Sequence, residues 1–144
     1  MGVWTADELR LFKTLSSPEK IQAYLDSIKY NTDSITRSPR AVIKTRRAHC
    51  FDGALFAAAA LELIGEKPLV MYLESSPEDD DHVLALFRHG HGWGAIAKSN
   101  YTTCRYRDPV YRSLRELAMS YFDGYFNLAG VKTLRGYSRP FDLR

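Results

Sequence analysis

The sequence predicts an α+β fold in which helices collect on one side of a mostly antiparallel sheet. In the first half of the chain, apolar residues recur at helical spacing behind recognisable helix caps. This half ends in an almost unbroken apolar run, residues 53–61, which is too apolar for a surface helix and is expected inside the core. After Pro68 come short β-like runs, and one more helical pattern follows them.

Length and composition indicate one domain over residues 1–144. With 144 residues, of which 45% are hydrophobic and 26% charged, the chain can bury a core of its own. Two cysteines are too few for a disulfide framework, which favours a reducing compartment. The N-terminal residues show no secretory signal, and no apolar run approaches the ~20 residues that span a bilayer. We therefore expect a cytoplasmic protein without a membrane partner.

The net charge of +3 is mild, and most basic residues are spread along the chain. One local group consists of Arg37, Arg40, Lys44, Arg46 and Arg47. Because a nucleic-acid-binding protein usually concentrates positive charge more strongly on one face, we interpret this group as a solvated basic loop. An anionic substrate or an acidic partner beside this loop stays open as an alternative.

Two helices are expected before this loop. Thr5 and Glu8 form a capping box, and the apolar positions behind it have helical spacing. Those positions are Leu9, Phe12 and Leu15. The second helix begins at Ser17-Pro18, because proline suits the first helical position, and it should end near Asn31.

Residues 32–47 are polar, basic and interrupted by Pro39, so we expect a loop with at most one short turn. The apolar helix follows over residues 50–64, and Gly65 provides its C-terminal stop.

The second half predicts an antiparallel sheet and a last helix. The expected strands are residues 69–74, 82–88, 93–99 and an extended stretch at 101–108 that Pro109 ends. A glycine-rich turn at 89–92 joins the second and third strands as a hairpin. Behind a second capping box at Ser113, apolar residues keep helical spacing as far as Phe126. Residues 133–144 should pack as an extended segment on the outside.

Cys50 is the first candidate for chemistry, because it stands at the expected start of the apolar helix. There a thiol meets unpaired N–H groups and the positive end of the helix dipole, which favour the thiolate. A catalytic role needs a base that takes the thiol proton and a third group that orients the base. Without these, Cys50 is a small packing residue.

Among the histidines, His82 fits the role of base best. It opens a strand directly after an acidic loop, where the sheet holds its backbone while the ring reaches the rim. His49 adjoins Cys50 and points about 100° away on a helix. His89 and His91 lie at the hairpin turn, and no recurrent spacing makes them a zinc site with Cys104 or His82. We expect neither a metal nor a cofactor.

Asp108 is the candidate orienting residue. It ends an alternating stretch, and Pro109 biases it toward extended geometry. A carboxylate at a strand end can accept a hydrogen bond from an imidazole, which fixes its tautomer and stabilises the imidazolium.

Three segments together resemble the transglutaminase-like superfamily of papain-type cysteine enzymes. They are residues 48–54 (AHCFDGA), 81–83 (DHV) and 106–109 (YRDP). The resemblance covers roughly residues 38–127, the expected catalytic core, and is greatest to small bacterial stand-alone members. It implies a papain-like fold in which a buried helix that begins at the cysteine packs on an antiparallel sheet.

The resemblance also implies a Cys-His-Asp triad. Cys50 is then the nucleophile, His82 the base and later the acid, and Asp108 the orienting group. The chain departs from larger family members, because no Gly- or Trp-rich sequence precedes the cysteine and no side chain can be assigned as an oxyanion donor. The backbone N–H of Cys50 is the donor we expect.

These observations favour an enzyme that hydrolyses or transfers an acyl group from a peptide or small amide. Hydrolysis is favoured over cross-linking, since nothing indicates a dedicated amine site that excludes water. One alternative is an inactive transglutaminase-like fold that acts as a binding or scaffold module. The weaker alternative is nucleic-acid binding by the basic loop, which predicts an affinity that falls steeply with salt.

Overall fold

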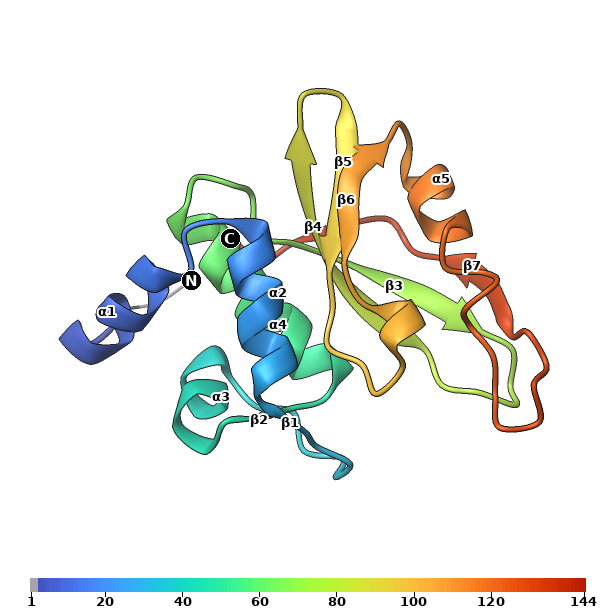
Figure 1. Cartoon of the computed structure of the whole chain (residues 1–144), viewed down its shortest axis with the longest axis horizontal. Coiled ribbons are helices and arrows are strands. Elements are labelled where there is room, and N and C mark those ends of the chain that lie inside the picture. The colour runs from blue at the N-terminus through green and yellow to red at the C-terminus, as the bar shows by residue number, and fades with distance from the viewer. Residues whose placement is uncertain (1–2) are drawn as a thin grey trace.

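A curled antiparallel sheet with helices packed around it forms the centre of the fold, which a computed structural model describes for residues 3–144 (Figure 1). The helices are α1 (Ala6–Thr14), α2 (Pro18–Ser27), α3 (Pro39–Thr45), α4 (Cys50–Leu63), the 3₁₀ turn η1 (Thr102–Cys104) and α5 (Leu114–Met119). The strands are β1 (Lys29–Tyr30), β2 (Arg47–Ala48), β3 (Leu69–Ser75), β4 (His82–His89), β5 (Gly92–Ile96), β6 (Arg107–Tyr111), β7 (Leu134–Tyr137) and β8 (Phe141–Asp142). The predicted α+β class is confirmed.

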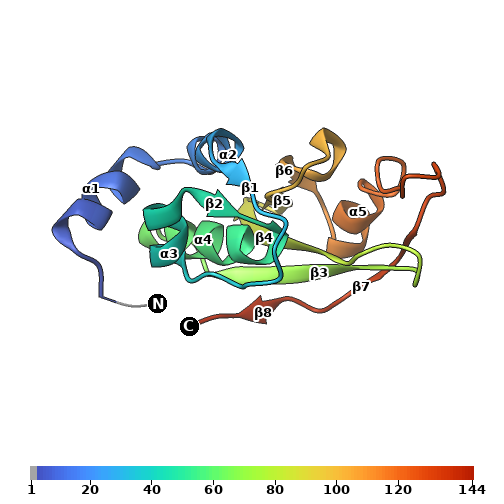
Figure 2. The same ribbon diagram turned by 90° about the horizontal axis from the view of Figure 1, so that it is seen from below.

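The main sheet has the strand order β6-β5-β4-β3-β7, and β8 also pairs with β3. Every pair in it is antiparallel, and β4 and β5 form the expected hairpin, with His89 opposite Gly92 at the turn. β1 and β2 form a separate parallel pair. Figure 2 shows β8 running beside β3, so residues near the C-terminus are extended at the outside, as expected.

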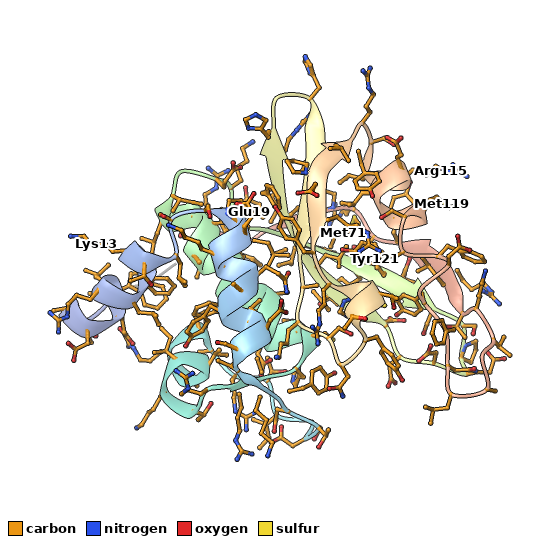
Figure 3. All side chains as sticks on the ribbon, in the orientation of Figure 1. Lys13, Glu19, Met71, Arg115, Met119 and Tyr121 are labelled. Atoms are coloured by element: carbon orange, nitrogen blue, oxygen red, sulfur yellow. The ribbon has the colours of Figure 1, made fainter. Side chains whose placement is uncertain are left out.

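The prediction that the helices collect on one side of the sheet is wrong for α5. Strands β4–β6 run between α4 on one side and α5 on the other (Figure 1). Ala85 and Phe87 of β4 join the core formed with α1–α4, whereas Leu84 and Leu86 join a second core. That core contains Met71 and residues around α5, among them Tyr121 (Figure 3). Both faces are therefore buried, which explains why β4 is apolar without alternation.

Helix α4 is the buried helix that the sequence predicts. Residues 52–54 and 56–61 are buried, so the helix is enclosed along most of its length. It ends as expected, because Gly65 adopts a positive φ of 96°, a conformation that other residues rarely accept.

Local caps set the starts of the other helices. The Thr5 hydroxyl accepts a hydrogen bond from the Glu8 N–H at 3.1 Å, and Glu8 Oε1 accepts one from the Thr5 N–H at 2.8 Å, which confirms the capping box. The Ser17 hydroxyl caps α2 by accepting a hydrogen bond from the Lys20 N–H at 3.3 Å. That helix ends at Ser27 and not near Asn31, because the chain extends into β1.

One helix was missed. The predicted loop at residues 32–47 contains α3, which has the same start as α2: Ser38 is the N-cap and Pro39 the first helical residue. The C-cap of α3 is Arg46, whose backbone adopts the left-handed conformation at φ 54°. Pro39 therefore starts a helix here and does not interrupt one.

The last helix is shorter than its apolar spacing predicts. α5 ends at Met119, although Tyr121 and Tyr125 remain buried. Tertiary contacts hold the chain in turns after this point. The Thr103 hydroxyl donates to the Gly124 carbonyl at 2.7 Å, and the Tyr121 hydroxyl donates to the Arg105 carbonyl at 2.6 Å.

The structure of residues 101–108 also differs from the extended stretch that the sequence predicts. It begins with η1, and β6 starts at Arg107 and continues through Pro109. A proline is tolerated here because β6 is an edge strand, where one side of the backbone has no partner strand.

Candidate active site

A cavity of about 490 Å³, here called the cysteine cavity, opens where the N-terminus of α4 meets the start of β4. The segment after β5 and the turns after α5 close its other sides. Its lining residues are Tyr30–Asp33, His49, Cys50, Asp79–His82, Ser99–Tyr101, Cys104 and Gly124–Phe126. Cys50 and His82 thus share one cavity, although 32 positions separate them in the sequence.

Cys50 is the first residue of α4 and is partly buried with a free thiol. His49 is the N-cap of this helix, and its Nδ1 accepts a hydrogen bond from the Phe51 N–H at 3.2 Å. One turn further, Gly53 lies so close to Lys98 that an added Cβ would stand 2.5 Å from the Lys98 Cβ. Glycine at this position therefore lets the first turn of α4 reach the segment that follows β5.

Lys98 holds this segment in place. Its Nζ donates to the carbonyls of Leu25 and Ile28, both at 2.6 Å, at the C-terminal end of α2. The ammonium is buried, and this burial lowers the pKa of Lys98. Lys98 is a structural residue that ties α2 to the end of β5, and it does not line the cysteine cavity.

The ionisation of Cys50 differs from the sequence expectation. Burial raises the pKa of the Cys50 thiol. Interactions with the backbone N–H groups of Val83, Phe51 and Cys50 itself act in the opposite direction, as a helix N-terminus should, but they are smaller. The free protein therefore holds Cys50 as a thiol at neutral pH, and the predicted thiolate is not favoured.

His82 is the first residue of β4 and is only 7% exposed. Its Nε2 lies 2.7 Å from the carbonyl oxygen of Cys104. Because a carbonyl only accepts hydrogen bonds, Nε2 carries the proton and donates it. The neutral ring then has its lone pair on Nδ1, to which no residue of the described chain donates or accepts a hydrogen bond.

Burial also controls the charge of His82. It lowers the pKa of the imidazole to about 4, and the positive charge of Arg107 contributes in the same direction. The hydrogen bond to the Cys104 carbonyl opposes this shift without reversing it. At neutral pH, Cys50 and His82 are consequently a thiol and a neutral imidazole.

Asp108, the predicted orienting residue, does not join them. Its side chain is exposed on the edge strand β6 and does not line the cysteine cavity. Arg107 pairs with Ala95, which pairs with Leu86, four residues from His82 along β4. At about 3.3 Å per residue this is roughly 13 Å, and Asp108 lies further away. The Cys104 carbonyl occupies the orienting position instead.

His49 is not a free base. Its Nδ1 accepts from the Phe51 N–H, and its Nε2 lies 2.9 Å from the Ile35 carbonyl. Asp52, fully buried, has one carboxylate oxygen 3.4 Å from His49 Nδ1, and its other oxygen accepts a hydrogen bond from the Arg37 N–H. These contacts fix the start of α4 and leave His82 as the histidine with an available ring nitrogen at the cavity.

Two lining residues were missed by the sequence reasoning. Asn31 is 7% exposed, and its buried side-chain Nδ2 has no partner at good hydrogen-bond geometry, although the Asn31 side chain lies close enough to Asp33 to help lower the pKa of that carboxyl. Its backbone is fixed, because the Asn31 N–H donates to the Ala48 carbonyl at 3.0 Å. A buried amide donor left unpaired is costly unless a ligand pairs with it. No local pattern in the sequence marks Asn31, since only the folded chain brings it to Cys50.

Tyr30 is the second. Burial, and then the negative charge that Cys50 would carry as a thiolate, raise the pKa of Tyr30 to about 12. Its hydroxyl stays protonated at neutral pH and is a hydrogen-bond donor at the cavity.

His89 and His91 lie at the β4–β5 turn, at the other end of β4 from His82. Within residues 3–144, no group of three or more His, Cys, Asp or Glu side chains is arranged to hold a metal ion. In the same residues, no helix has the length and apolar character needed to cross a bilayer.

Comparisons with known proteins name no family for this chain. A scan against protein-family models finds none that matches, and a search of curated proteins finds no significant match.

Proposed function

We propose that this protein is a cysteine enzyme of the transglutaminase-like, papain-type class that hydrolyses or transfers an acyl group from an amide. One observation carries the proposal: the thiol at the start of α4 shares a cavity with a histidine whose proton is held on Nε2 by the Cys104 carbonyl. This tautomer leaves Nδ1 as the basic nitrogen. The proposed triad is Cys50, His82 and the Cys104 carbonyl.

In the first step, the Cys50 sulfur attacks the amide carbonyl carbon while its proton passes to His82 Nδ1. The electron pair of the carbonyl double bond moves onto oxygen. The Cys50 backbone N–H can stabilise this oxyanion, since N–H groups in the first turn of a helix have no partner within the helix. Asn31 Nδ2 provides the second donor that the sequence did not reveal.

In the second step, the protonated His82 gives its proton to the leaving amine, and a thioester on Cys50 remains. Water then attacks the thioester, His82 takes a proton from it, and the acid and free thiol are released. An amine in place of water would give acyl transfer. Hydrolysis is the favoured outcome, because exposed polar side chains of the lining, among them Asp80, Asp81 and Asn100, let water reach the thioester.

The neutral state of the pair shapes this chemistry. Burial disfavours a preformed thiolate–imidazolium pair, because it raises the pKa of Cys50 and lowers that of His82, and the Cys104 carbonyl supplies only a dipole. The proton therefore moves during the attack on the carbonyl.

The same observation supports the second candidate, a fold that binds its ligand without turning it over. Because the Cys104 carbonyl stands where a triad would have a carboxylate, the His82 imidazolium is less stabilised than in a Cys-His-Asp triad. A protein that only binds its ligand would tolerate the resulting loss of activity. The two candidates differ in the covalent step, which only the enzyme performs.

The test has two parts. Turnover is measured with a series of fluorogenic amides, and the protein is then labelled with an acyloxymethyl ketone derived from the best substrate of the series. We expect label on Cys50 by mass mapping, and loss of both label and turnover in Cys50→Ala and His82→Asn. Cys104→Ser is the matched control, since it removes the other thiol but keeps the carbonyl that holds His82. Full turnover by Cys50→Ala would overturn the proposal.

A further inference from the structure

The charge around the cysteine cavity is opposite to that of the whole chain. Four aspartates line it, Asp33, Asp79, Asp80 and Asp81, and no lysine or arginine does. The chain nevertheless carries a formal net charge of +3. The β3–β4 loop, residues 76–81, contributes three of the four.

Asp33 is neutralised, because its Oδ2 lies 3.0 Å from Arg37 Nη2. The three loop aspartates are not. Asp79 accepts hydrogen bonds from the Thr133 hydroxyl at 2.6 Å and the Asp80 N–H at 2.8 Å. These donors are uncharged, so they hold the carboxylate in place without cancelling its charge.

Asp81 is held in the same manner by Ser75, whose N–H donates to it at 2.9 Å, while the Ser75 hydroxyl donates to the Asp79 carbonyl at 2.8 Å. The side chain of Asp80 is exposed, and no lysine or arginine of the described chain forms an ion pair with it. The loop itself is fixed, because the Tyr125 hydroxyl donates to the Asp80 carbonyl at 2.5 Å. A rigid group of unpaired negative charges thus borders the nucleophile.

Aromatic rings face the same space. Tyr101 and Phe126 line the cavity with their rings in edge contact, 6.3 Å apart at 61°, and they are 45% and 39% exposed. Exposed rings beside carboxylates attract organic cations, since the ring face is electronegative and the carboxylate adds full charge. Of the basic loop residues that the sequence suggested for an anionic ligand, Arg37 is paired with Asp33 and Arg40 with Glu8.

Asn31 supplies an independent indication of a ligand. Its buried Nδ2 lines the same cavity, can only donate, and has no partner at good hydrogen-bond geometry; it acts on the Asp33 carboxylate, which is already paired with Arg37, so a ligand carbonyl oxygen or oxyanion can accept from it. One cavity therefore offers a donor for a carbonyl and a negative, aromatic border for a cation.

We propose that the acyl donor carries an ammonium or guanidinium group close to the scissile amide, as in a lysine- or arginine-containing peptide. The cation lies against Asp80, Asp81 and the Tyr101–Phe126 pair while the carbonyl lies between Cys50 and Asn31. This inference rests on the proposed function, and it names the substrate class of the same site.

The test measures the cavity's charge preference without turnover. In a Cys104→Ser background, Cys50 is modified with a cationic (trimethylammonium-ethyl) and an anionic (sulfonato-ethyl) methanethiosulfonate, and both rates are divided by those of a small free thiol. We expect the cation to be preferred by about tenfold at low salt, and less as ionic strength rises. Asp80→Asn with Asp81→Asn should bring the ratio close to that of the free thiol.

Glu74→Gln is the matched control, because Glu74 is an exposed acid of β3 that does not line the cavity, and it should leave the ratio unchanged. Equal normalised rates for the two reagents in the parent protein would overturn the inference and leave the proposed function standing. In a second measurement, kcat/KM for lysine-containing amides should exceed that for matched norleucine amides. Equal values would overturn the inference, and absent turnover of every amide would overturn the proposed function.

Discussion

His82 Nε2 and the carbonyl oxygen of Cys104 lie 2.7 Å apart, and this contact decides which nitrogen of the imidazole is basic. It links the first residue of β4 to the turn η1, 22 positions further along the chain. A backbone carbonyl orients the ring as a carboxylate would, but it adds no negative charge. The ionisation of the site follows from this difference, and so do the predictions below.

Alkylation of Cys50 by iodoacetamide should be slow at neutral pH. Since burial raises the pKa of the thiol, less thiolate is present at a given pH than in a free cysteine. The rate should rise about tenfold per pH unit through the neutral and mildly alkaline range, with no plateau at acidic pH. Rates followed by intact mass in Cys104→Ser protein give this profile. A fast, flat profile between pH 5 and pH 8 would instead show a preformed ion pair.

The stability of the fold should depend on His82 between pH 4 and pH 6.5. Burial lowers its pKa to about 4 in the folded protein, so in this range the unfolded chain binds a proton that the folded chain excludes. The free energy of unfolding should therefore rise with pH across this window, by up to roughly 3 kcal/mol. Urea unfolding at several pH values measures the slope.

His82→Asn should flatten that part of the curve, and His89→Asn, an exposed histidine on the same strand, should not. Equal slopes for the two variants would show that His82 is not excluded from protonation by the fold.

Loss of the Asn31 donor should lower kcat more than it changes KM. The donor is required when charge develops on oxygen, and removing one such donor typically costs about 10²–10³-fold in kcat. Asn31→Leu has nearly the same size, and it keeps the backbone hydrogen bond to Ala48. Asn100→Ala, at an exposed position of the same cavity, is the control. A folded Asn31→Leu enzyme with unchanged kcat would remove Asn31 from the oxyanion site.

Asp108→Asn should change turnover by less than about twofold, because Asp108 lies on the edge strand away from the cysteine cavity. Steady-state kinetics on the best amide substrate check this directly. A fall comparable to that of His82→Asn would restore Asp108 to the triad and require a different arrangement of β6.

Local signals in the sequence predicted much of the fold. The side-chain oxygens of the caps at Thr5, Ser17 and Ser113 each accept a hydrogen bond from an N–H three residues further along, so they act within a single turn. The start of α4 at Cys50 and the β4–β5 hairpin were also predicted correctly, because their signals in the sequence are local. α3 was missed although Ser38-Pro39 repeats the signal of Ser17-Pro18, because the polar residues around it hid the helix.

Two features could not be predicted from local sequence signals, because they depend on tertiary contacts. They are the end of α5 and the Cys104 carbonyl as the group that orients His82. Apolar spacing continues to Phe126, but hydrogen bonds from Thr103 and Tyr121 replace helix with turns. A backbone carbonyl such as that of Cys104 leaves no trace in residue type, so a search for acidic side chains selected Asp108 instead. Asn31 reaches the cavity through the β1–β2 pairing, which two short strands do not reveal in sequence.

The most direct test of the central claim is to trap the acyl-enzyme. The protein is mixed with a 4-nitrophenyl ester of a lysine-containing acyl group, quenched in acid within seconds, and digested for mass mapping. We predict a thioester on Cys50 in the parent protein and in Cys104→Ser, with a strongly reduced yield in His82→Asn. Acylation that is absent, or that is found only on lysines at equal yield in all three proteins, would contradict the assignment of Cys50 and His82 as the reacting pair.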